Sequence, residues 1–378
     1  MRIGVDVRPF LSRETGVGTY LRHLLFELAR IDKGNEYCLF SSSWKERFPP
    51  EKVPPFVRST FRDLRIPVRA LNFLWYRLAW PPFERFFGGR LDLTHSPTPV
   101  PLPGRSKKIV TVYDLFFLDD PDRSVREARR VFAGNLSDSL AAADGILAIS
   151  EFTRRSILDR FPVPEEKIAV APLGLNPLLA VDVPSAVLEK TRGKYGLPER
   201  FILFVGAVER RKNLVNLLEA LVLVRRAGDP IELLLAGREG EASAEVEAAV
   251  ERLGLGSAVR TLGYLPDTEV RDLYRLARVL VFPSLCEGFG LPLLEAMASG
   301  LPSAVSRAGA LPEVGGDAAA YFEPEDPGDI ARVIMELLGN ESRRREFADK
   351  GRRRASGFSW AETARRTLAF YERTAGAG

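Results

Sequence analysis

The stretch that says most about the fold is Pro283-Ser-Leu-Cys-Glu-Gly-Phe-Gly-Leu-Pro-Leu-Leu-Glu-Ala-Met-Ala-Ser-Gly300, which directly follows the apolar run Val279–Phe282. A short apolar run bounded by turn residues is typical of a buried strand. Gly288 and Gly290 allow a tight turn after it, and Pro292 suits the first turn of a helix, where no N–H is needed. The stretch therefore predicts a strand, a glycine-rich loop and a helix in succession.

This loop has the composition of a phosphate site with a carboxylate on either side. Free N–H groups at a helix N-terminus bind anions. Glu287 precedes the loop, and Glu295 lies in the helix with its side chain directed back toward the N-terminus. Carboxylates accept strong hydrogen bonds from hydroxyl groups. Either glutamate alone could be a solvated surface charge, but the whole string favours a polyhydroxylated ligand that carries phosphate.

The same alternation of strand and helix runs through both halves of the chain. Further strand-like runs occur at 3–7, 37–40, 91–94, 108–112, 145–149, 168–171, 201–205, 232–235, 259–262 and 303–305. Helical patterns separate them at 20–31, 125–143, 214–226, 244–253, 267–276 and 291–298. This order predicts an α/β protein with two facing, Rossmann-like, doubly wound parallel sheets and a ligand in the cleft at the carboxyl ends of the strands.

The domain boundary is expected in the segment 172–198, which is rich in proline and glycine. We therefore predict an N-terminal domain over 1–175 and a C-terminal domain over 176–358. The remaining residues, 359–378, form a last amphipathic helix. Its periodicity leaves open whether it packs on the second domain or crosses back to the first.

Composition excludes several classes of protein. With 54 basic and 50 acidic residues the net charge is +4, and only two cysteines and two histidines are present. A disulfide framework and a histidine-based zinc site are therefore not expected. No apolar run is long enough to span a membrane, and no P-loop occurs. The Asp120-Pro121-Asp122 triplet is a formal DxD metal-binding motif, but its surroundings do not fit the fold in which that motif occurs.

The string 283–300 resembles the E-x7-E signature of family 4 retaining glycosyltransferases, which have the GT-B fold. Other segments match that family's pattern in the same order. They are Phe204-Val-Gly206-Ala-Val-Glu209-Arg-Arg211-Lys212-Asn213, Leu235-Ala236-Gly237, Leu262-Gly263-Tyr264 and Leu311-Pro312-Glu313-Val314. The family often has Arg directly after the first glycine, whereas this chain has Ala207.

The resemblance implies that 1–175 is the acceptor-side domain and 176–358 the nucleotide-sugar donor-binding domain. It also implies a role for each matching residue. Glu287 would bind hydroxyls of the donor sugar, and Glu295 those of the ribose. Arg211 and Lys212 would neutralise the diphosphate, as a bidentate guanidinium and a point charge. The other donor-binding positions are Gly206, Gly237, Tyr264, Gly288, Phe289, Gly290 and Leu291.

Three segments of the first half are expected on the acceptor side. The loop 13–20 contains Gly16, Val17 and Gly18, and it lacks the third glycine of a dinucleotide fingerprint. Tyr113-Asp114 stands where many relatives have His-Asp, and a phenol is a poorer acid or base near neutral pH. His95 ends the neighbouring strand, where it either lines the cleft or is an ordinary structural histidine.

The expected reaction is transfer of a sugar, with mannose favoured, from a nucleoside diphosphate such as GDP to an acceptor hydroxyl with retention. We expect a place in polysaccharide, lipopolysaccharide or lipid-linked glycan biosynthesis, with neither a metal nor a cofactor. A nucleotide-sugar epimerase and a non-catalytic nucleotide-sugar binding protein are the alternatives. The incomplete fingerprint disfavours a dehydrogenase.

The segment 45–90 combines ten basic and four acidic residues with ten aromatic ones. The aromatic residues either fill the core of the first domain or, over 69–90, form a surface for an anionic membrane or a lipid-linked acceptor. We expect a cytoplasmic protein, with peripheral contact at the inner face of the membrane in the second case. No motif for nucleic-acid binding occurs.

Overall fold

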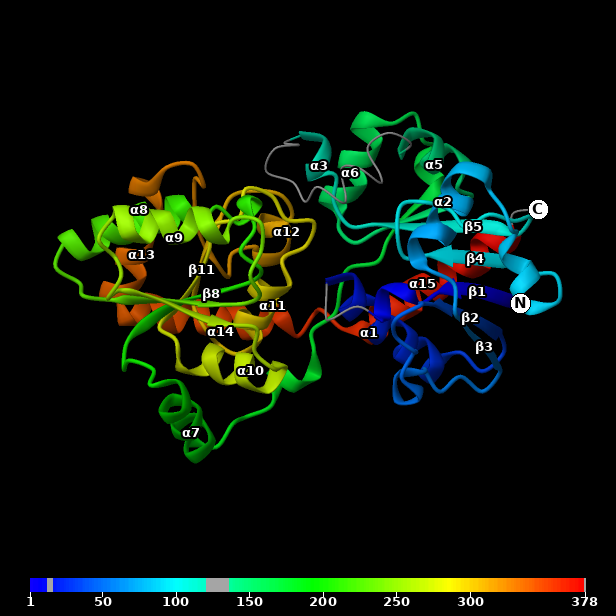
Figure 1. The fold of residues 1–378 in the computed structure, drawn as a ribbon. Helices are drawn as coiled ribbons and strands as arrows, with labels where there is room; N and C mark the ends of the chain where they lie inside the picture. The colour runs from blue at the N-terminus through cyan, green and yellow to red at the C-terminus, as the bar shows by residue number, and fades with distance from the viewer. Residues whose placement is uncertain (12–15, 120–135, 377–378) are drawn as a thin grey trace. The chain divides into compact units, whose positions relative to one another are not determined.

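The computed structural model describes residues 1–11, 16–119 and 136–376, which form two compact units (Figure 1). The first unit comprises Met1–Leu115, Arg130–Gly174 and Ser359–Gly378. The second contains Leu175–Phe358 together with Phe116–Asp119. Apart from the short segment that begins at Phe116, the chain passes from the first unit to the second after Gly174 and returns after Phe358.

Within the described residues, the first unit contains a seven-stranded parallel sheet in the order β3-β2-β1-β4-β5-β6-β7. Its strands are β1 (Arg2–Asp6), β2 (Glu36–Ser42), β3 (Ser59–Leu64), β4 (Leu93–Ser96), β5 (Lys107–Val112), β6 (Gly145–Ala148) and β7 (Ile168–Val170). Six of them lie where the apolar runs predict strands. The seventh, β3, is a polar edge strand that was not predicted.

The first unit has helices on both faces of this sheet. They are α1 (Gly16–Ile31), α2 (Val68–Leu78), α5 (Leu136–Ala142), α6 (Glu151–Arg160) and α15 (Trp360–Gly376). Tyr37 of β2 donates a hydrogen bond to Asp32, just beyond α1, whereas Cys38 and Phe40 pack in a cluster with residues of α2. Because successive strand residues point to opposite faces, α1 and α2 cover opposite sides of the sheet.

The C-terminal helix α15 packs against α1, although more than three hundred residues separate them (Figure 1). The ring of Trp360 stacks on that of His23 at a centroid distance of 4.9 Å. A Cβ atom at Gly174 would lie 2.0 Å from the Trp360 backbone nitrogen, so position 174, which packs against the start of α15, accepts only glycine. The last helix is thus part of the first unit.

The second unit repeats the architecture with a six-stranded parallel sheet in the order β10-β9-β8-β11-β12-β13. Its strands are β8 (Phe201–Val205), β9 (Glu232–Ala236), β10 (Val259–Gly263), β11 (Val279–Phe282), β12 (Ser303–Ser306) and β13 (Ala320–Phe322). In both sheets the strand order reverses beside the first strand. In open α/β sheets, ligands bind at this switch point, beyond the carboxyl ends of the strands.

Eight helices of the second unit lie within 175–358, all of it described. They are α7 (Ser185–Tyr195), α8 (Leu214–Arg226), α9 (Ser243–Arg252), α10 (Asp267–Leu276), α11 (Leu291–Ala298), α12 (Leu311–Gly315), α13 (Pro327–Gly339) and α14 (Glu341–Ala355), while the short α3 is Phe116–Asp119. Short 3-10 helices include η3 (Phe83–Phe87) and η6 (Arg210–Lys212). Among the described residues, no helix is long and apolar enough to cross a membrane.

Candidate active site

The candidate site lies in two loops at the switch point of the second sheet. One loop follows β8 and contains η6, and the other follows β11 and leads into α11. The Leu285 N–H donates to the Arg211 carbonyl at 2.8 Å, which joins the loops directly. Asn213, in the left-handed region at φ 58°, donates from Nδ2 to the carbonyls of Pro283 (3.2 Å) and Pro324 (2.6 Å). The two loops are therefore held in register by the backbone and by one amide side chain.

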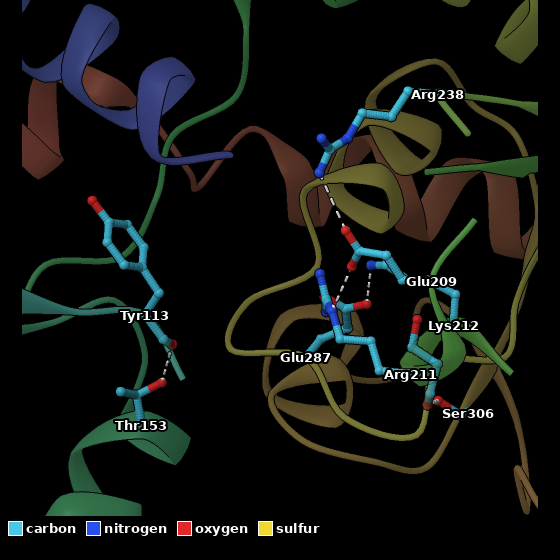
Figure 2. A network of polar contacts seen from close by, with 9 residues as sticks. Tyr113, Thr153, Glu209, Arg211, Lys212, Arg238, Glu287 and Ser306 are labelled. Atoms are coloured by element: carbon cyan, nitrogen blue, oxygen red, sulfur yellow. Dashed lines mark hydrogen bonds and ion pairs between the residues drawn. The ribbon is translucent and has the colours of Figure 1, made fainter. Parts of the chain in front are cut away.

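A cluster of five charged side chains, here called the charge cluster, occupies these loops (Figure 2). Arg211 Nη1 donates to Glu287 Oε2 at 3.1 Å, and Lys212 Nζ donates to Glu287 Oε1. Arg211 Nε also donates to Glu209 Oε2 at 2.9 Å, and Arg238 Nη2 reaches Glu209 Oε1 at 3.3 Å. Three cations thus face two carboxylates, which leaves one net positive charge.

Burial makes these interactions strong. Glu209, Lys212 and Glu287 are all buried. Burial alone would raise the pKa of Glu287, but the Lys212 ammonium and the Arg211 guanidinium outweigh it and lower that pKa to about 2. Burial and the Arg211 charge lower the pKa of Lys212, while Glu287 opposes them. Glu287 is therefore a carboxylate throughout the physiological range.

Glu295 projects from α11 and has a different environment. Tyr274 Oη, from α10, donates to Glu295 Oε2 at 2.9 Å. Burial raises the pKa of Glu295 to about 7, the Asp267 carboxylate acts in the same direction, and the Tyr274 hydrogen bond opposes both. The two carboxylates of the E-x7-E string therefore differ in ionisation: one is always charged and the other titrates near neutral pH.

The loop before α11 requires glycine at its last position. Gly290 has φ 98°, and a Cβ atom there would lie 2.5 Å from Leu311 Cδ2. Gly288 and Phe289 are buried in the same loop, where the Phe289 ring meets the Phe358 ring edge-on at 5.7 Å, and Leu291 begins the helix. The loop thus brings its backbone close to the N-terminus of α11.

The predicted nucleotide-binding positions lie side by side at the ends of β8, β9 and β10. Gly206 N donates to the Ala236 carbonyl, and Gly237 N donates to the Gly263 carbonyl, both at 2.9 Å. A Cβ atom at Gly237 would lie only 1.9 Å from the Gly206 oxygen. Beyond Gly263, the Tyr264 side chain is 58% exposed. The structure therefore gathers these positions at one edge of the sheet.

In the first unit, His95 is an interior residue. It is fully buried, Nδ1 pairs with Tyr371 Oη at 2.6 Å, and Nε2 pairs with Thr111 Oγ1 at 2.7 Å. Burial lowers the pKa of His95 to about 3, so the ring is neutral. Of the two alternatives for His95, this environment fits the structural histidine and not a cleft residue.

Tyr113 follows β5 and is half-buried, as is Asp114. The Tyr113 carbonyl accepts a hydrogen bond from Thr153 Oγ1 at 2.8 Å (Figure 2), and its ring meets the Tyr20 ring edge-on at 5.5 Å. Burial raises the pKa of Tyr113 well above its usual range. The phenol therefore stays protonated and cannot serve as a base near neutral pH.

The remaining acceptor-side positions begin α1, where Gly16 is exposed, Val17 is half-buried and Gly18 is buried. The predicted loop's residues 13–15 and the DxD triplet 120–122 lie outside the described residues. Three site residues were not predicted from the sequence: Glu209, Arg238 and Tyr274. Arg238 directly follows a glycine at a strand end, which is the one sequence signal that could have identified it.

Comparison with known proteins agrees with this geometry. Residues 189–354 match the family model of group 1 glycosyl transferases, and residues 15–177 match that of glycosyltransferase family 4. O-antigen chain mannosyltransferase B from Escherichia coli is 33% identical over 385 residues, covering 98% of this chain and all of the relative. The chain therefore belongs to the group 1, or family 4, glycosyltransferases.

Solved structures show the same fold. Sucrose-phosphate synthase from Thermosynechococcus elongatus matches over the full length of both chains, with a TM-score of 0.78 and 21% identity. Anabaena HepE, solved in complex with UDP and glucose, matches over 99% of this chain and 100% of its own, with a TM-score of 0.75 and 17% identity. The fold is GT-B, and the protein is a glycosyltransferase. None of these matches supports the epimerase alternative.

Proposed function

We propose that this glycosyltransferase moves a mannosyl residue from a nucleoside diphosphate mannose, with GDP the favoured base, to a hydroxyl of a polysaccharide or lipid-linked glycan. The charge cluster at the switch point is the observation that carries the proposal. It places Arg211 and Lys212 against Glu287, in the loop that leads into α11, where an anionic leaving group is stabilised. The name of the Escherichia coli relative supports the choice of mannose and of a polysaccharide acceptor.

Donor binding would exchange partners within the charge cluster. Diphosphate oxygens compete with Glu287 for Arg211 and Lys212, because phosphate accepts the same charge-assisted hydrogen bonds. The Glu287 carboxylate is then released to accept from hydroxyls of the donor sugar, and Glu295 accepts from the ribose hydroxyls. Arg211, Lys212 and Glu287 are already held in place by ion pairs in the unliganded protein, and Glu295 by the Tyr274 hydrogen bond.

Retention and metal independence are parts of the same proposal. As the bond from the anomeric carbon to the diphosphate oxygen breaks, positive charge grows on the sugar ring and negative charge on the leaving group. The acceptor oxygen attacks from the side that the diphosphate leaves, and a phosphate oxygen takes the acceptor proton. Arg211, Lys212 and the helix N-terminus supply the neutralisation that a metal ion provides in other transferases.

A thermal-shift series tests the donor site. We expect one of GDP, UDP and ADP, with its mannose or glucose conjugate, to stabilise the protein by about 2.7 kcal/mol at one hundred times its Kd, with or without EDTA. A stabilisation that EDTA abolishes would contradict metal independence. No stabilisation by any nucleotide would contradict the donor site itself.

Activity assays test the chemistry. Glu287→Ala and Lys212→Ala should each abolish most transfer to an acceptor glycan, and full activity in both variants would refute the assigned roles. The anomeric configuration of the product, read by NMR, distinguishes retention from inversion. Tight donor binding without turnover on any acceptor would instead favour the non-catalytic binding protein.

A further inference from the structure

An exposed surface of the first unit combines large apolar side chains with arginines and lies outside the charge cluster. We call it the α2 surface. Its residues are Trp44, Lys45, Val68, Arg69, Phe73, Arg77, Leu78, Trp80 and Arg85, all of which are exposed. The apolar members include Trp44 at 67%, Phe73 at 61% and Leu78 at 60% exposure. Large aromatic groups left this open on one patch are a signature of an interaction site.

The helix α2 has two distinct faces. Its inner face places Leu71 and Trp75 in the core, as expected for an amphipathic helix. Its outer face carries Arg69, Phe73 and Arg77, which follow one another at intervals of four residues. An outer face that only met water would not need an aromatic ring between two arginines. The outer face of α2 therefore offers an apolar contact between two cationic ones.

The loop before the helix extends the same surface. An open pocket of about 580 Å³ is lined by residues 43–46 of this loop and 67–69 at the start of α2. Trp44 and Val68 therefore border one depression. The α2 surface is continuous across two segments that are more than twenty residues apart in the sequence.

The charge of this surface is compensated only in part: in the loop 43–46, Glu46 offsets Lys45, but the arginines of α2 have no such neighbour. Residues 65–90 contain five arginines and a single acidic residue, Glu84. The Glu84 carboxylate accepts from the backbone N–H groups of Arg105 (2.8 Å) and Ser106 (2.9 Å), which uses its charge within the fold. Within the described residues, Arg69 and Arg77 form no ion pair. The positive charges of the α2 surface are thus available to a partner.

We propose that the α2 surface lies on a bilayer of anionic phospholipids. The aromatic rings would lie at the boundary between headgroups and acyl chains, and the arginines would bind lipid phosphates. A second copy of the chain would bring two positive surfaces together, so the charge disfavours it as the occupant. The proposal does not depend on the donor sugar or on the roles given to the charge cluster.

The test is vesicle sedimentation of the full-length protein. We expect binding to phosphatidylcholine vesicles that contain phosphatidylglycerol, little binding to pure phosphatidylcholine, and weakening by salt. The double substitution Arg69→Gln with Arg77→Gln should weaken binding by about 30-fold, since each basic residue near an anionic surface contributes about one factor of five. High salt screens the arginines and leaves the apolar contribution, so at high salt the double substitution Trp44→Ser with Phe73→Ser should weaken vesicle binding more than the arginine pair does.

Matched controls make the result decisive. Arg226→Gln with Arg353→Gln removes the same charge from exposed positions of the second unit and should leave binding unchanged. Equal losses of vesicle binding in the control and test pairs would show non-specific attraction and overturn the proposal. The proposal would also be overturned if the protein did not bind anionic vesicles, or if it bound neutral vesicles equally well. Self-association that Trp44→Ser with Phe73→Ser abolishes, without vesicle binding, would identify a second copy as the occupant. Because donor binding is measured separately by thermal shift, failure here leaves the proposed function intact.

Discussion

The titration of Glu295 gives a quantitative prediction for donor binding. If the ribose hydroxyls donate to this side chain, only the ionised form binds well, and apparent affinity scales with the ionised fraction. With a pKa of about 7, about one tenth is ionised at pH 6 and about nine tenths at pH 8. The Kd for the nucleotide sugar should therefore be about tenfold higher at pH 6 than at pH 8.

Two substitutions should move this profile in opposite directions. Tyr274→Phe removes the hydrogen bond that Glu295 accepts, so the pKa of Glu295 rises and the midpoint shifts to higher pH. Asp267→Asn removes a nearby negative charge, so the pKa falls and the midpoint shifts to lower pH. Neither substitution touches the charge cluster, so the affinity at high pH should change little.

Isothermal titration calorimetry with a nucleotide sugar is the suitable assay, because this ligand has no terminal phosphate that ionises between pH 6 and 8. Glu295→Gln is the control and should bind weakly with the same Kd at both pH values. A flat profile for the unmodified protein would refute the reasoning, and so would a Tyr274→Phe midpoint below that of the unmodified protein.

Other predictions concern stability. Glu287→Ala leaves the Lys212 ammonium buried without its partner and should lower the free energy of unfolding by about 3–5 kcal/mol in urea titrations. The double substitution Glu287→Leu with Lys212→Met removes both charges, so it should recover most of this stability while the protein stays inactive. Gly237→Ala should cost about 1–3 kcal/mol by overpacking, but Gly256→Ala, with no atom within 4 Å of its added carbon, should leave the Tm unchanged. The pKa of His95 is about 3 in the folded protein, so unfolding takes up a proton below about pH 6.5. The free energy of unfolding should therefore fall by up to about 1.4 kcal/mol for each unit by which the pH is lowered from 6.5 toward 3. His95→Gln should reduce that slope.

The parts of the fold that the sequence predicts best are those with buried, continuous apolar strands. Strands β8 and β11 and helices α8 and α11 begin and end where the pattern predicts. By contrast, β3 is an edge strand whose residues are exposed or half-buried, so it carries no apolar run. In the aromatic segment 69–90, Trp75 and Phe83 are buried while Phe73 and Trp80 are exposed, so only some of these rings fill the core.

The site was less accessible from the sequence for a physical reason. Motif spacing places Glu287, Arg211 and Lys212 on loops at the ends of two strands, and the parallel sheet then brings them together. The partners of these residues depend on other elements. Glu209 meets Arg238 only because β8 and β9 are neighbours, and Tyr274 meets Glu295 only because α10 packs near α11. No local pattern encodes such pairings.

The return of α15 to the first unit also constrains how the protein folds during synthesis. His95 is translated early, but its partner Tyr371 lies 276 residues further along the chain. At about 5–20 residues per second, the ribosome needs tens of seconds to span that distance. The second unit can complete its sheet in this interval, whereas the surface of α1 that packs against α15 stays uncovered until α15 has been synthesised. A stop codon before residue 360 would thus leave the second unit, which holds the charge cluster, complete, and the first unit without α15.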